Sequence, residues 1–136
     1  MKMIKSLFFS FLIAFFSVAL ASGAELDSRL IGKWQGMRNK DTKCIFLSWT
    51  TNFKPDGSFE ITFYSNKEKT KKIQTETGTW KASNGKNELK TDRVRTPEIY
   101  IYTFVDDDTV KYVNTVRDQT ADCQADYEFT EYRIKE

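Results

Sequence analysis

Apolar and polar residues alternate over short runs from residue 32 to the end of the chain. The clearest run is 58–64, where single polar residues separate Phe59, Ile61 and Phe63. This alternation predicts a strand with one buried face and one solvent-exposed face, because successive side chains of a strand point to opposite sides. No stretch beyond residue 24 has the sustained 3.6-residue apolar period of a helix. The pattern predicts eight strands, at 32–38, 43–53, 58–64, 73–81, 86–94, 98–105, 109–116 and 125–134.

Turn-forming residues separate these strands and favour sequential hairpins. Pro55-Asp56-Gly57 and Asn84-Gly85 are the strongest signals, because proline presets φ for a turn and glycine accepts a positive φ. A meander of eight antiparallel strands closes most simply as an up-and-down barrel, which leaves no unpaired edge. We therefore predict an all-β fold, an antiparallel up-and-down β-barrel of about eight strands. A two-sheet β-sandwich is the alternative.

A leader precedes this predicted domain. Lys2 and Lys5 are followed by an apolar run at 7–20, which has the length of a signal-peptide core and is short for a membrane span. Small residues then allow cleavage after Ala21, or as late as Ala24. An uncleaved N-terminal anchor is the alternative. The sequence predicts a signal peptide at 1–21, a single barrel domain at 25–136, and an exported protein that is periplasmic or secreted.

The charge balance argues against nucleic acid as a partner. The chain has 21 basic and 19 acidic residues, and Lys2 and Lys5 would leave with the leader. The mature charge is then close to zero, whereas nucleic-acid-binding domains gather positive charge. The mature chain also has no apolar run long enough to span a membrane. We expect no nucleic acid partner and no membrane span in the mature chain.

Two cysteines, Cys44 and Cys123, predict one disulfide, since an even pair in an exported protein is typically oxidised. A reactive or metal-bound pair is the alternative. The chain has no Cys-x-x-Cys motif and no histidine, so histidine-based nucleophile pairs and histidine metal sites are excluded. We expect no metal site and no cofactor.

Four glutamates in predicted strands are the remaining candidates for acid–base chemistry: Glu60, Glu76, Glu128 and Glu131. Two carboxylates facing each other inside a barrel would have separated pKa values and could act as acid and base. Single carboxylates in the middle of a strand usually lie on the solvent face. The acidic run 106–108 favours a turn over a calcium site. We therefore predict no catalytic residues and a protein that is not an enzyme.

Aromatic side chains are the stronger indication of a site. With 11 Phe, 6 Tyr and 3 Trp, the chain could line a pocket with rings, or pack the same rings into a core without a cavity. Both interpretations fit a barrel of about eight strands. The candidate pocket residues are Trp49, Phe59, Ile61, Phe63, Trp80, Tyr102, Tyr112 and Phe129.

Four motifs in order resemble the small bacterial members of the lipocalin-like (calycin) group. They are Leu30-x-Gly32-x-Trp34, Phe53-x-Pro55-Asp56-Gly57-x-Phe59, Gly78-Thr79-Trp80 and Tyr127-x-Phe129-x-x-x-Arg133. The resemblance covers nearly the whole mature chain. It implies that Trp34 lies across the barrel floor and that Arg133 packs on its ring, a favourable pairing of guanidinium and indole. The chain is shorter than the large lipocalins and lacks a convincing C-terminal helix, so a roomy ligand cavity is not implied.

The barrel, the rings and the resemblance together predict an exported, non-enzymatic binding protein that holds a small apolar or amphipathic ligand. The alternative is a solid barrel that binds another protein, either as an inhibitor of an exported enzyme or as a component of an envelope assembly. A ligand-binding barrel requires an internal cavity, whereas a protein-binding barrel requires an exposed apolar patch.

Overall fold

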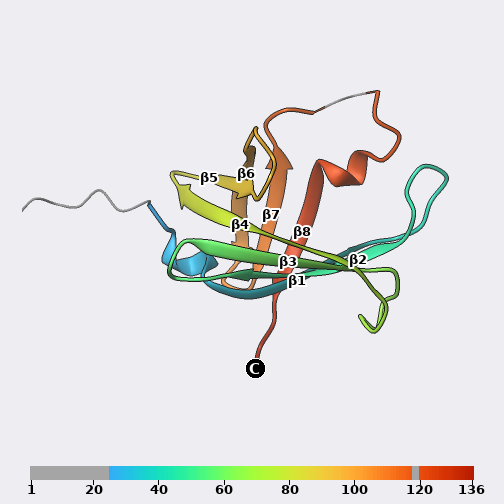
Figure 1. The fold of residues 1–136 in the computed structure, drawn as a ribbon, viewed down its shortest axis with the longest axis horizontal. Coiled ribbons are helices and arrows are strands. Elements are labelled where there is room, and N and C mark those ends of the chain that lie inside the picture. The colour runs from blue at the N-terminus through green and yellow to red at the C-terminus, as the bar shows by residue number, and fades with distance from the viewer. Residues whose placement is uncertain (1–24, 118–119) are drawn as a thin grey trace, which may run out of the picture.

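The computed structural model describes residues 25–117 and 120–136, which form a closed antiparallel barrel in the order β1 to β8 (Figure 1). The strands are β1 (Gly32–Arg38), β2 (Leu47–Phe53), β3 (Ser58–Tyr64), β4 (Lys72–Ser83), β5 (Lys86–Thr91), β6 (Glu98–Asp106), β7 (Thr109–Asn114) and β8 (Glu128–Arg133). Two 3-10 turns, η1 (Ser28–Leu30) and η2 (Gln124–Asp126), precede β1 and β8. β1 pairs with β8 and closes the barrel. The predicted all-β up-and-down barrel is confirmed.

The predicted signal peptide lies outside the described residues. In Figure 1, β1 to β3 lie across the view and β6 to β8 stand upright, so the two halves of the barrel cross. Within residues 25–117 and 120–136, no helix is both long and apolar enough to cross a membrane.

Both predicted hairpin signals form tight turns. Asn84 and Gly85 have φ of 51° and 76°, the left-handed conformation that a two-residue hairpin turn needs. Gly57 has φ of 85°, and the Asp56 carboxylate accepts a hydrogen bond from the Ser58 backbone N–H at 2.9 Å. These turns fix the registers of β2 with β3 and of β4 with β5, and so decide which side chains point inward.

One end of the barrel is closed by a floor built around Trp34. Trp34 is fully buried, and its Nε1–H donates to the Leu30 carbonyl in η1 at 2.8 Å. The Arg133 guanidinium lies 4.2 Å from the centre of the Trp34 ring. Arg133 also donates to the Arg29 carbonyl at 2.7 Å and to the Asp108 carboxylate at 3.2 Å. This single side chain therefore ties η1 and the β6–β7 turn to β8.

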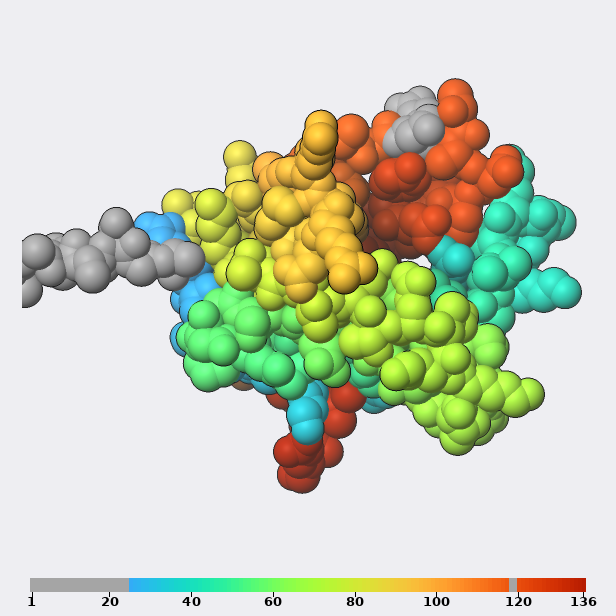
Figure 2. Space-filling view, viewed as in Figure 1, coloured from blue at the N-terminus to red at the C-terminus, as the bar shows by residue number. Residues whose placement is uncertain are grey.

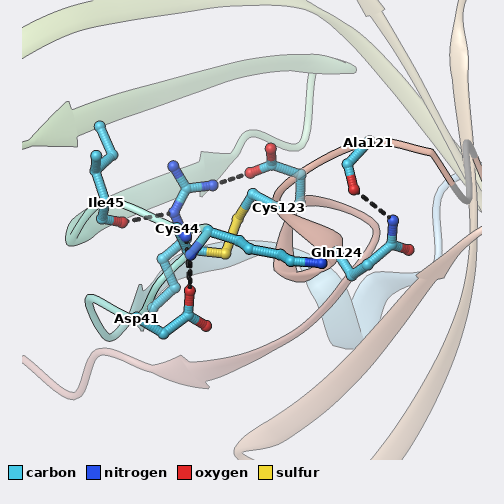
Figure 3. The surroundings of a disulfide bond; sticks show 9 residues. Asp41, Cys44, Ile45, Ala121, Cys123 and Gln124 are labelled. Carbon is cyan, nitrogen blue, oxygen red and sulfur yellow. Dashed lines mark hydrogen bonds and ion pairs between the residues drawn. A yellow bond between two sulfur atoms is a disulfide. The ribbon is translucent and has the colours of Figure 1, made fainter.

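The other end of the barrel carries the disulfide. Cys44 in the β1–β2 connection is bonded to Cys123, just before η2, as the sequence predicts (Figure 3). β2 begins at Leu47 rather than at residue 43, because the Asp41 carboxylate accepts hydrogen bonds from the backbone N–H groups of Lys43 and Cys44 at 2.7 Å each. Ile45, which the longer predicted strand would have included, is 68% exposed. The predicted start of the last strand at residue 125 is likewise too early, since η2 occupies 124–126 and β8 begins at Glu128.

Candidate functional site

The half of the barrel opposite the floor contains a cavity of about 260 Å³. Its wall reaches from Phe63 near the end of β3 and Glu98 at the start of β6 down to Thr51 and Phe53 on β2, and Thr51 is paired with Trp34 in the sheet. In Figure 2 the surface is hollowed between the golden segment that leads into β6 and the red segment that includes η2. The barrel therefore has a closed floor and an open mouth.

A buried carboxylate, Glu131 of β8, lines this cavity and is 4% exposed. Its Oε1 accepts hydrogen bonds from Trp49 Nε1–H at 3.0 Å and from the Thr51 hydroxyl at 2.8 Å. Both donors lie on β2, so the interaction crosses over β1, which lies between β2 and β8. Within the described part of the chain, only Oε1 of this carboxylate accepts hydrogen bonds.

Gly36 of β1 makes this crossing possible. A Cβ at position 36 would lie 2.4 Å from the nearest carbon of the Trp49 indole, closer than any side-chain contact tolerates. Gly36 is also the β1 residue paired with Trp49 in the sheet. Because position 36 has no side chain, the indole can lie over β1 and reach Glu131.

Burial dominates the protonation of this carboxyl. It raises the pKa of Glu131 from an ordinary 4.5 to about 7, although the hydrogen bonds from Thr51 and Trp49 lower it. Burial, followed by the charge of Glu131, also raises the pKa of Tyr112. Glu131 therefore changes its charge near neutral pH while Tyr112 stays neutral.

Four buried polar atoms of the cavity wall have no hydrogen-bond partner within the described part of the chain. They are Glu131 Oε2, the Tyr112 hydroxyl, and both Oδ1 and Nδ2 of Asn87. Asn87 is fully buried and Tyr112 is 2% exposed. Leaving such an atom unpaired costs about 1–3 kcal/mol, so buried polar groups in proteins are normally satisfied by protein, water or ligand. The wall thus presents donors and acceptors in an otherwise aromatic surrounding.

Several aromatic rings line the cavity, and four of them form one cluster: Trp49, Tyr100, Tyr112 and Phe129. Phe129 stacks on Tyr112 with ring centres 5.2 Å apart and meets Trp49 and Tyr100 edge-on at 5.6 and 5.5 Å. Edge-on and stacked pairs of this kind stabilise one another and fix the ring orientations. The apolar surface of the cavity is therefore preorganised.

The mouth is predominantly acidic. The cavity wall includes four carboxylates and one guanidinium, and that guanidinium, Arg38, already forms an ion pair with Asp126. Burial, followed by the nearby charge of Glu98, raises the pKa of Glu76, and Glu98 accepts a hydrogen bond from the Tyr100 hydroxyl. Among the described residues, Glu76, Glu98 and Glu131 form no ion pair.

Five of the eight candidate pocket residues line the cavity: Trp49, Ile61, Phe63, Tyr112 and Phe129. The other three, Phe59, Trp80 and Tyr102, do not. They point inward but sit nearer the floor: Trp80 packs on Phe53 at 4.8 Å, and Tyr102 donates to the Asp27 carboxylate at 2.8 Å. Strand parity predicts which side chains point into the barrel. It does not predict how far each lies from the floor, because neighbouring strands run in opposite directions.

Of the four glutamates considered from sequence, Glu60 is exposed and Glu128 is ion-paired with Lys111 at 2.8 Å. The expectation that a mid-strand carboxylate lies on the solvent face is wrong for Glu131. Strand parity indicates this burial from the sequence. Phe129 is a candidate pocket residue and Arg133 a candidate floor residue, and Glu131 lies two residues from each, on the same face of the strand.

Asn87 also lines the cavity, and it is not among the pocket residues predicted from the sequence. The Asn84-Gly85 turn pairs Ala82 with Asn87, and residues paired directly across two strands share a face. Ala82 lies two residues from the inward-facing Trp80, so the hairpin register alone places Asn87 inside the barrel.

Within residues 25–117 and 120–136, no three or more acidic or cysteine side chains gather as a group that could hold a metal ion. No protein-family model, curated protein or solved structure matches this chain. The closed eight-stranded barrel is compatible with a lipocalin-like fold, and the candidate site rests on the geometry of the cavity itself.

Proposed function

We propose that this chain is an exported, non-enzymatic binding protein of lipocalin-like type, which holds a small amphipathic molecule in the open half of its barrel. The observation that carries the proposal is the cavity of about 260 Å³, whose aromatic wall contains buried polar atoms with no partner in residues 25–117 and 120–136. Small-molecule sites are typically apolar pockets with a few polar groups that orient the ligand. The disulfide supports export, because such bonds persist in oxidising compartments.

The cavity supports this function over the alternative of a solid barrel that binds another protein. In a solid barrel, the unpartnered polar atoms of Asn87, Tyr112 and Glu131 would stay without hydrogen bonds and would destabilise the fold. A ligand with its own donors and acceptors would satisfy them. Exposed apolar side chains do occur, among them Ile73, Ile101 and Val105. They are spread over β4 and β6, and single exposed apolar residues are ordinary on protein surfaces.

Native mass spectrometry of the protein purified from its own source tests the proposal. We expect a stoichiometric adduct of a few hundred daltons, released on denaturation, and a mature mass that begins at Ser22 or at Glu25. Ile61→Trp should abolish the adduct, because Ile61 lines the cavity and the larger ring would fill it. The matched control Ile73→Trp, at a position that is 52% exposed, should retain it. A clean apo mass for the wild-type protein would contradict the proposal.

A further inference from the structure

The cavity wall is rich in carboxylates as well as in aromatic rings. It holds the carboxylates of Glu76, Glu98, Asp126 and Glu131, and the single guanidinium among the lining residues is paired with Asp126. A cleft lined predominantly by one sign of charge attracts ligands of the opposite sign. An anionic head group, such as a fatty acid carboxylate, would meet repulsion at the mouth and again at Glu131.

The inner end of the cavity offers partners for an N–H-bearing cation. Glu131 Oε1 accepts hydrogen bonds from Trp49 and Thr51, while Oε2 has no partner among the residues that the structure describes. Asn87 and Tyr112 line the same cavity and lie near enough to each other for Asn87 to lower the pKa of Tyr112, but within the described residues neither Asn87 Oδ1 nor the Tyr112 hydroxyl forms a hydrogen bond. An ammonium carries up to three donors and no acceptor, so it can satisfy the three unpartnered oxygens, whereas the fourth unpartnered atom, Asn87 Nδ2, is a donor and needs an acceptor from elsewhere in the ligand or from water. Hydrogen bonds between an ionised donor and a carboxylate are also the stronger kind.

The aromatic rings favour the same ligand. Trp49, Tyr100, Tyr112 and Phe129 form part of the cavity wall, and the faces of such rings attract cations. The rings also provide apolar contact for the rest of the molecule. Since the volume is about 260 Å³, the body must be compact, of the size of one or two fused rings or a short branched chain.

We propose that the cavity binds a small organic amine, with its ammonium group against Glu131 Oε2, Asn87 and Tyr112 and its apolar body among the four rings. This inference rests on the proposed binding function and specifies the ligand class. Glu76 and Glu98 at the mouth contribute attraction at longer range, whereas Glu131 contributes the direct contact.

Isothermal titration calorimetry with three probes of similar shape tests the ligand class. The probes are 2-phenylethylamine, 2-phenylethanol and phenylacetate. We expect the amine to bind wild-type protein at least tenfold more tightly than the alcohol, and the acid to bind most weakly. Glu131→Gln should remove most of the preference for the amine while retaining alcohol binding. Glu60→Gln, the same change on the exposed face of β3, should leave the preference unchanged.

Proton release provides a second measurement. The groups that face Glu131 are Trp49 and Thr51 from β2, Tyr100 from β6 and Tyr112 from β7, with Arg38, Glu76 and Glu98 nearer the mouth. With the pKa of Glu131 at about 7, an ammonium that binds at pH 7 should drive off about half a proton. Titration in two buffers of different ionisation enthalpy measures this number. Glu131→Gln should abolish the release, whereas Glu76→Gln should preserve it.

The outcomes separate the two proposals. If the alcohol or the acid binds as tightly as the amine, the amine inference is wrong while the binding function stands. Amine binding that survives Glu131→Gln undiminished would also overturn the inference. If none of the three probes shows saturable binding, the inference fails, and together with a clean apo mass this result contradicts the binding function.

Discussion

At position 131 the chain places a carboxylate where the strand pattern requires an inward-facing side chain. Parity alone identifies this position, because Phe129, Glu131 and Arg133 share one face of β8. The sequence could not reveal that Oε2 lacks a protein partner, since the donors to Oε1 come from Trp49 and Thr51 some 80 residues earlier. Partners this distant in sequence depend on barrel closure, which no local pattern specifies.

The stability of the ligand-free protein should depend on pH through Glu131. In the folded state Glu131 keeps its proton up to about pH 7, whereas the unfolded chain releases it near pH 4.5. The folded state therefore binds more protons between these values, and the Glu131 contribution to the free energy of unfolding falls by about 3 kcal/mol as the pH rises from 4.5 to above 7. Urea unfolding at pH 5 and pH 8 measures this change.

Glu131→Gln removes the titrating group, so it should lose less stability than wild type between pH 5 and pH 8 and be the more stable protein at pH 8. Glu60→Gln provides the matched control and should follow the wild-type pH dependence. Identical pH profiles for wild type and Glu131→Gln would show that Glu131 titrates like an exposed carboxyl.

Gly36→Ala should displace the Trp49 indole, because the new Cβ would lie 2.4 Å from a ring carbon. We expect a loss of about 1–3 kcal/mol, the usual cost of overpacking, and a changed tryptophan fluorescence spectrum. In a Trp49→Phe background the same substitution should cost much less, because the smaller ring leaves room over β1. Equal costs in the two backgrounds would contradict the crossing of Trp49 over Gly36.

At the level of elements, the sequence predicts every strand, and the strand starts that follow strong turn signals are correct: β3 begins at Ser58 after Gly57, and β5 begins at Lys86 after Gly85. Strand ends are predicted less well, since β5 ends at Thr91 rather than at residue 94 and β7 at Asn114 rather than at residue 116. The starts of β2 and β8 differ because Asp41 turns the chain and because η2 replaces extended backbone near Cys123. Side-chain capping and a cross-link between distant segments override strand propensity there.

The floor should be one of the most sensitive parts of the barrel, since it joins η1, β1 and β8. Trp34→Ala should cost about 3–5 kcal/mol, because it removes a fully buried ring together with its hydrogen bond to Leu30 and its contact with Arg133. Denaturant unfolding measures the loss. Tyr132→Ala removes a 54%-exposed ring from the neighbouring strand and should cost far less. A loss below about 1 kcal/mol for Trp34→Ala would place this ring outside the core.

The disulfide should stabilise the mouth as well as the whole chain. It joins residues 79 apart, which is worth roughly 4 kcal/mol in the chain-entropy model. Reductant should therefore lower the free energy of unfolding of wild type and leave a Cys44→Ala/Cys123→Ala variant unaffected. Amide exchange should rise most at 41–46 and 124–126, the segments that the bond connects. Thiols that react with alkylating agents in the native exported protein would contradict this bond.

At the level of the whole molecule, the barrel divides into a packed half at the floor and an open half at the mouth. Sequence reasoning could not separate the two, because Phe59 and Phe63 are equivalent in strand parity and differ only in their distance from Trp34. Phe63 lines the cavity, whereas Phe59 belongs to the packed core. The existence of a cavity depends on how the rings of all eight strands fill a fixed interior, and small differences in packing decide it.

The proposed function depends on both the charge and the shape of the open half of the barrel. Carboxylates at the mouth and Glu131 at the inner end favour a cationic ligand, and the four rings favour an apolar body. Both properties arise from residues that lie far apart in sequence and meet only in the closed barrel. The proposed ligand class therefore depends on the assembled fold rather than on any one motif.

The pKa of Glu131, measured from its side-chain carboxyl ¹³C shift and assigned with Glu131→Gln, tests the central feature of this site. We expect a pKa of about 7 in the ligand-free protein, raised by burial, and a value below about 5 when 2-phenylethylamine saturates the cavity and its ammonium stabilises the carboxylate. A pKa near 4.5 that does not change with the amine would mean that Glu131 is solvated and that no ammonium binds beside it.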